Sequence, residues 1–116
     1  MNLKIQKILL KKNKSKIVSL TAYSKNISKI LDKHCDIILV GDSMANVLYG
    51  LKNTDKISLK NIIQHTLSVQ QGVKKSLLVV DIPNRIMGSK AGLNLKIMGF
   101  LTSLGNDSVS SFSLTF

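Results

Sequence analysis

A short apolar run that ends in three small polar residues constrains the fold of this chain more than any other feature. Residues 37–40 read Ile-Ile-Leu-Val and run directly into Gly41, Asp42 and Ser43. Such a run is typical of a strand that is buried on both faces, as in a parallel sheet. Parallel α/β proteins build their sites at the carboxyl ends of their strands. Asp42 and Ser43 are therefore candidate site residues, and Gly41 is expected to allow a tight exit from the strand.

The same pattern returns further along the chain. Residues 77–80 read Leu-Leu-Val-Val and run into Asp81, Ile82 and Pro83. The sequence therefore predicts two buried strands, each with an aspartate at its exit. Those two aspartates are the main chemical feature of the chain.

The remaining segments alternate between helical and strand patterns. The expected elements are a helix over 3–10, a strand over 16–21, a helix from Ser24 to Lys33, a strand over 36–40, a loop or short helix over 44–55, a helix from Ser58 to about Val73, and a strand over 76–80. The apolar residues expected to face the sheet are Ile27, Ile30 and Leu31 in the first of the longer helices, and Leu59, Ile62, Ile63, Leu67 and Val69 in the second. Ser24 and Ser58 are the expected N-caps. The alternation predicts an α/β fold with right-handed crossovers and a parallel sheet.

The pattern weakens after Pro83. Glycines at 88, 92 and 99 interrupt the segment where the next helix is expected, and each costs roughly 1 kcal/mol relative to alanine. The end of the chain, from residue 108, is rich in serine. A fourth helix and a fourth strand are left open.

Composition excludes several classes of protein. The 116 residues suffice for one modest domain, and no apolar run approaches the roughly 18 to 20 residues of a membrane span. The N-terminus shows no secretory signal, and the single Cys35 is expected to be a small buried hydrophobic residue, which favours a reducing, cytoplasmic setting. The net charge of +11 raises nucleic-acid binding as an alternative. However, all but one of the basic residues are scattered lysines, and aromatics make up only 4%, so a solvated lysine-rich surface is the preferred interpretation.

Four segments in a fixed order resemble one enzyme family. They are residues 16–23 (Lys-Ile-Val-Ser-Leu-Thr-Ala-Tyr), residues 37–43, residues 64–66 (Gln-His-Thr) and residues 77–83. At these separations they are similar to the ketopantoate hydroxymethyltransferase (3-methyl-2-oxobutanoate hydroxymethyltransferase) family, over residues from about 3 to 83.

The resemblance implies both a fold and a reaction. The family is a TIM (β/α)8 barrel that transfers a hydroxymethyl group from 5,10-methylenetetrahydrofolate to 3-methyl-2-oxobutanoate, giving 2-dehydropantoate in pantothenate synthesis. A divalent ion, normally Mg²⁺, holds the 2-oxo acid in that family. By position, Asp42 and Asp81 would be metal ligands, and Asp42, Ser43 and Asp81 would bind the substrate. The family also assembles as large homo-oligomers.

The chain departs from the family in its last third. Asp107, Ser108 and Val109 begin the fourth-strand motif, but Ser110 stands at the family's lysine position and Phe112 at its metal-binding glutamate position. The general-base glutamate of the family lies beyond this chain, which contains no glutamate, so the catalytic base is unknown. Ala45 replaces the usual glycine. Because a full barrel needs about 250 residues, we expect three to four βα units, with residues 1–83 family-like and residues 84–116 a divergent tail.

Three functional hypotheses follow from the sequence. The first is a fragment of the hydroxymethyltransferase, altered after about Pro83 and inactive on its own. The second is a non-catalytic half-barrel that covers its open sheet edge by binding another chain. The third is a basic nucleic-acid-binding protein, which the buried strands disfavour.

Simpler interpretations apply to individual residues. Asp42 and Ser43 could cap a short helix, and Asp81 could open an Asp-x-Pro turn. Tyr23 could close over the site or pack beneath it. For His65, a surface or helix-packing role is preferred to catalysis.

Overall fold

The computed structural model describes residues 3–83 together with the backbone of one further strand. Its elements are α1 (Leu3–Lys11), β1 (Ser19–Thr21), α2 (Lys25–Leu31), β2 (Ile37–Val40), α3 (Met44–Val47), α4 (Leu59–Gln70), β3 (Leu77–Asp81) and β4 (Val109–Ser113). The expected order of helices and strands is confirmed from α1 to β3. β4 supplies the fourth strand that the sequence left open, whereas the segment of the possible fourth helix lies outside the described residues.

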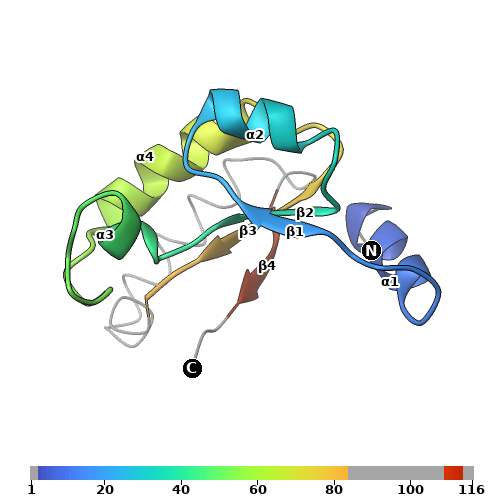
Figure 1. The fold of residues 1–116 in the computed structure, drawn as a ribbon, viewed down its shortest axis with the longest axis horizontal. Coiled ribbons are helices and arrows are strands. Elements are labelled where there is room, and N and C mark those ends of the chain that lie inside the picture. Colours follow the sequence, from blue (N-terminus) through green and yellow to red (C-terminus); the bar gives the residue numbers. More distant parts are fainter. Residues whose placement is uncertain (1–2, 84–108, 114–116) are drawn as a thin grey trace.

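The four strands form one parallel sheet in the order β1-β2-β3-β4. Figure 1 shows α2 and α4 on one side of this sheet, α1 near the end where the strands begin, and α3 near the end where β2 stops. Each strand lies beside the next one in the chain, as expected for successive βα units. The predicted α/β class with a parallel sheet is confirmed.

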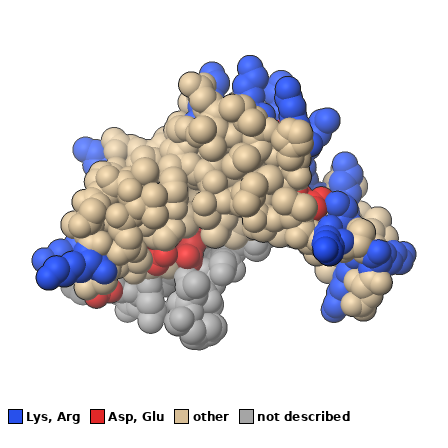
Figure 2. Space-filling view, in the orientation of Figure 1, with Lys and Arg blue, Asp and Glu red and all other residues tan. Residues whose placement is uncertain are grey.

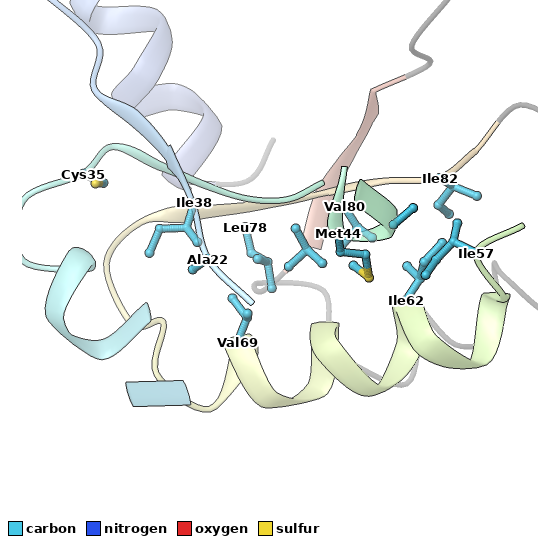
Figure 3. Close-up of a cluster of buried hydrophobic side chains, with 12 residues drawn as sticks. Ala22, Cys35, Ile38, Met44, Ile57, Ile62, Val69, Leu78, Val80 and Ile82 are labelled. Atoms are coloured by element: carbon cyan, nitrogen blue, oxygen red, sulfur yellow. The ribbon is translucent and has the colours of Figure 1, made fainter. Parts of the chain in front are cut away.

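The core fills the space between α4 and one face of the sheet. Ile38 and Val40 of β2 and Leu78 and Val80 of β3 point into it, and all four are 2% exposed or less. They meet the α4 side chains Ile62 and Val69, as Figure 3 shows. Because Ile38 lies opposite Leu78, and Val40 opposite Val80, the apolar faces of β2 and β3 are in register.

Burial of the strands differs from the expectation in one respect. β3 is buried at every position, but β2 is buried only on its helix face, and Ile37 and Leu39 on its other face are half-buried. The three residues of β1 are all exposed. The expected burial on both faces is therefore confirmed for β3 and is wrong for β2.

The expected inward face of α2 is confirmed at Leu31, which packs against the core, and is wrong at the other two positions. Ile27 and Ile30 are 50% and 60% exposed, and the fully buried residue of this helix is Ser28. The Ser28 Oγ donates hydrogen bonds to the carbonyl oxygens of Lys25 and Val69. Packing is close here, because a Cβ added at Gly72 would lie 2.2 Å from the Ser28 Oγ. A small residue, rather than a large apolar one, therefore makes the contact between α2 and the end of α4.

Several smaller expectations are confirmed. The Ser58 side chain caps α4 by accepting a hydrogen bond from the Asn61 N–H, whereas Ser24 makes no such bond. Cys35 is buried. None of the described helices is long and apolar enough to cross a membrane.

Candidate metal and substrate site

The two aspartates singled out in the sequence lie at the same edge of the sheet. Asp81 is the last residue of β3, and Asp42 follows β2 by two residues. Val40 is the register partner of Val80, so the chain delivers both carboxyl groups at the carboxyl ends of adjacent strands. Asp81 ends the strand directly before Ile82 and Pro83, so an Asp-x-Pro turn at this position stays an alternative.

The carboxyl groups of Asp42 and Asp81 interact directly. Burial raises the pKa of Asp42, and the charge of Asp81 and a hydrogen bond with its carboxyl group raise that pKa further. Hydrogen bonds from the Thr54 side chain and from the Ser43 backbone N–H act in the opposite direction but do not outweigh these effects. Asp81 is only 7% exposed. The Asp42 carboxyl group therefore resists ionisation at this edge, and a bound cation would favour its ionised form.

Ser43 lies beside this pair and is turned toward Tyr23. The Ser43 Oγ and the Tyr23 hydroxyl are hydrogen-bonded at 2.8 Å. Although α3 begins at the next residue, the Ser43 side chain makes no capping hydrogen bond to it. Ser43 is therefore the N-cap residue of α3 by position, but its side chain does not cap the helix.

Gly41 is needed for a different reason from the one expected. Its φ is not positive, since Gly50 is the glycine with a positive φ among the described residues. A Cβ at position 41 would instead lie 3.0 Å from the Ser43 Oγ, closer than side chains usually approach. Glycine at this position leaves room for the Ser43 hydroxyl.

A second group of residues extends the site toward α4. The His65 Nδ1 lies 2.9 Å from the Tyr23 carbonyl oxygen, and its Nε2 lies 2.9 Å from the Tyr49 hydroxyl. Tyr23 and His65 were candidates from the sequence, but the sequence did not predict a contact between them. Tyr49 and Thr54 were not among the candidates. Tyr23 and His65 are 42 positions apart, so helical or strand periodicity carries no signal of this contact.

The donor set suits a hard cation. Two carboxyl groups meet here, and Mg²⁺ commonly uses only one or two protein carboxylates and leaves other positions to water and substrate. Within residues 3–83, no group of three or more His, Cys, Asp or Glu side chains could hold a metal ion. The backbone of β4 lies beside β3, with position 112 opposite Val80, and the residue at that position is Phe.

Comparison with known proteins identifies the family of this chain. A family model described as ketopantoate hydroxymethyltransferase matches residues 2–102, which extends past Pro83. The chain is 56% identical over 95 residues to the 3-methyl-2-oxobutanoate hydroxymethyltransferase of Pelagibacter ubique, covering 81% of this chain and 37% of that protein. It is 49% identical over 67 residues to the Rhizobium rhizogenes protein of the same name, covering 58% of this chain and 24% of that protein.

A third relative of that name, from a Chelativorans species, is 46% identical over 72 residues, covering 62% of this chain and 26% of that protein. The chain thus spans between about a quarter and somewhat over a third of the length of these three relatives. The family match covers most of the chain and includes both aspartates and Ser43. The chain belongs to the ketopantoate hydroxymethyltransferase family.

Proposed function

We propose that this chain supplies the metal-binding and carboxylate-binding part of a 3-methyl-2-oxobutanoate hydroxymethyltransferase site. The reaction transfers a hydroxymethyl group from 5,10-methylenetetrahydrofolate to the 2-oxo acid to give 2-dehydropantoate. The observation that carries the proposal is the meeting of Asp42 and Asp81 at one edge of the sheet, where the backbone N–H of Ser43 donates to Asp42. In this proposal the four-stranded sheet is the first part of a TIM barrel.

Each residue of the site would have a distinct role. Asp42 and Asp81 would hold Mg²⁺, whose chemistry when bound is to polarise the keto group of the 2-oxo acid. The Ser43 hydroxyl and the backbone beside it would bind the substrate carboxylate. The chain has no glutamate to serve as the general base that the resemblance implies, so we expect negligible turnover from this chain alone.

The first test is whether the purified chain binds the 2-oxo acid in the presence of Mg²⁺. We expect line broadening of the methyl signals of 3-methyl-2-oxobutanoate in NMR spectra when both the chain and Mg²⁺ are present. Asp42→Asn and Asp81→Asn should each abolish this effect. Asp55→Asn is the matched control, because Asp55 is an exposed aspartate of the α3–α4 loop, and it should leave binding unchanged. Equal binding by all four chains would refute the proposal.

A second candidate function is that of a non-catalytic half-barrel that associates with other chains in an oligomer. β1 is exposed at the edge of the described sheet, and Leu20, Ile27 and Ile30 nearby are between 48% and 60% exposed. Unpaired strand edges and exposed apolar residues favour association with another chain. Analytical ultracentrifugation would detect it: a concentration-dependent dimer or larger homo-oligomer supports assembly, and a monomer at all concentrations refutes self-association.

The surface charge bears on the nucleic-acid alternative. Figure 2 shows lysines on the α1 and α2 side of the molecule and a smaller group beside the loop after α3. These positions surround the described sheet without forming one continuous basic stripe in this view. We therefore propose small-molecule ligands rather than nucleic acid, in a cytoplasmic setting.

A further inference from the structure

A chain of hydrogen bonds runs from the surface of α4 to the proposed carboxylate-binding residue. Its links are Tyr49 to His65, His65 to the backbone of Tyr23, and the Tyr23 side chain to Ser43. We propose that Tyr23 is a positioning residue that fixes the direction of the Ser43 hydroxyl, and that His65 and Tyr49 hold Tyr23 in place. This inference rests on the proposed function, because it concerns how Ser43 meets the 2-oxo acid.

The hydrogen-bond partners of His65 indicate which ring nitrogen carries the proton. The Tyr23 carbonyl oxygen can only accept a hydrogen bond, so the His65 Nδ1 must carry the proton. In the neutral ring, Nε2 is then the acceptor for the Tyr49 hydroxyl. Both tyrosine rings also meet the His65 ring edge to face, with centroids 6.3 Å and 5.9 Å away. The backbone just past β1 is therefore anchored to α4 at a defined point.

The direction of the Tyr23–Ser43 hydrogen bond follows from the task of Ser43. A serine hydroxyl has one proton, and it must donate that proton in order to bind an anionic carboxylate. At 2.8 Å from Tyr23, the Ser43 Oγ must then accept the Tyr23 proton. Without Tyr23, the Ser43 side chain would be free to rotate among its staggered positions, and the substrate would have to select one of them.

Gly41 provides independent support for this arrangement. The position of the Ser43 Oγ that reaches Tyr23 is also the one that leaves only 3.0 Å for a Cβ at residue 41. The chain therefore has the smallest residue where a larger one would push the hydroxyl away from Tyr23. Tyr23 and Gly41, which follow β1 and β2, both restrict the position of the Ser43 hydroxyl, and His65 of α4 holds the Tyr23 backbone.

The test is a double-mutant cycle on binding of 3-methyl-2-oxobutanoate in the presence of Mg²⁺, titrated by NMR with the full chain. We expect Tyr23→Phe to weaken binding roughly fivefold, as for loss of one hydrogen bond. Ser43→Ala should weaken it at least as much, and the double variant should be no weaker than Ser43→Ala alone. Affinity for Mg²⁺ in the absence of the 2-oxo acid should be unchanged, which a general disruption of the fold would not allow.

Variants of His65 and Tyr49 test whether these two residues hold Tyr23 in place. His65→Ala should weaken 2-oxo acid binding, and His65→Asn should largely restore it, because the Asn amide can still donate to the Tyr23 carbonyl oxygen. Tyr49→Phe is the matched control for Tyr23→Phe, because it also removes one phenolic hydroxyl group. The Tyr49 hydroxyl contacts His65 and not Ser43, so its loss should weaken 2-oxo acid binding less.

The outcomes are distinguishable. Unchanged binding by Tyr23→Phe, additive effects in the cycle, or weakened Mg²⁺ binding by Tyr23→Phe would each overturn the inference and leave the proposed function standing. Failure of the folded wild-type chain to bind the 2-oxo acid with Mg²⁺ would overturn the proposed function, and the inference with it.

Discussion

Asp32 and Asp36 lie at the edge of the sheet where the strands begin, and Asp42 and Asp81 lie at the edge where they end. At the first edge, the Asp32 carboxylate accepts hydrogen bonds from the backbone N–H groups of Lys74, Lys75 and Ser76, just before β3. Asp36 accepts the Val18 N–H and pairs with the Lys11 ammonium at 2.6 Å. At the second edge, the two carboxyl groups instead face one another.

The pKa values follow this difference. Burial alone would raise the pKa of Asp32, but hydrogen bonds from the Ser76, Lys75 and Lys74 N–H groups outweigh it and lower the pKa. The pKa of Asp36 is lowered mainly by its hydrogen bond from Lys11. Asp42 shows the opposite shift, because burial and Asp81 both raise its pKa.

The contrast separates carboxyl groups that stabilise the fold from the pair that we propose to bind a ligand. A carboxylate whose acceptor sites are filled by N–H groups stabilises the native state and has little left for a cation. A close pair of carboxyl groups destabilises the native state unless something neutralises it. In a barrel, residues at the beginning of the strands commonly serve stability and residues at the end serve function.

Among substitutions at the edge where the strands begin, Asp32→Ala is expected to have the largest effect on stability. This change leaves three N–H groups without their acceptor, including the buried N–H of Ser76, and should lower the free energy of unfolding by about 3 kcal/mol. Urea unfolding followed by circular dichroism measures it. A loss below about 1 kcal/mol would show that water replaces the carboxylate, contrary to this account.

Asp36→Asn should have a smaller effect at the same edge. The Lys11 side chain is 41% exposed, so solvent screens the ion pair, and we expect a loss of about 1 kcal/mol or less. Adding salt to the wild-type chain should reproduce part of this loss. A loss of stability equal to that of Asp32→Ala would mean that solvent does not weaken the contribution of Asp36, contrary to this account.

The smallest expected effect is a difference in pH dependence between the two edges. Asp32 and Asp36 have lowered folded-state pKa values, so their stabilisation is full above the unfolded-state pKa of about 3.9 and is lost as the pH falls through the folded values. Asp42 has a raised folded-state pKa, so its contribution worsens as the pH rises from about 3.9 through that raised value. Unfolding of wild type and Asp42→Asn across this range should show the wild type losing stability relative to the variant as pH rises. A constant difference would contradict the raised pKa.

Much of the sheet and of the carboxylate pair could be predicted from sequence, because the information is local. The apolar runs that end at Val40 and Val80 identify two strands, and parallel pairing then brings Asp42 and Asp81 to one edge. The contacts of Tyr23 could not be predicted in this way. Its partners Ser43 and His65 are 20 and 42 positions away, and only the folded chain brings them together.

The prediction that Ile27 and Ile30 of α2 face the sheet was wrong for a related reason. Helical periodicity selects the large apolar residues Ile27 and Ile30, but the close approach of α4 at Gly72 requires the small Ser28 at the contact. Packing distance between helices is a tertiary property that a hydrophobic pattern does not contain.

The central claim is that Asp42 and Asp81 form a cation site and not a stabilising contact. Thermal unfolding of wild type, Asp42→Asn and the control Asp55→Asn, with and without Mg²⁺, tests it most directly. Without Mg²⁺, Asp42→Asn should unfold at a higher temperature than wild type, because the repulsion is removed. Mg²⁺ should raise the unfolding temperature of wild type and Asp55→Asn by roughly 3–5 °C, corresponding to about 1 kcal/mol, and leave Asp42→Asn unchanged. An Asp42→Asn chain that is less stable than wild type and responds equally to Mg²⁺ would contradict the account.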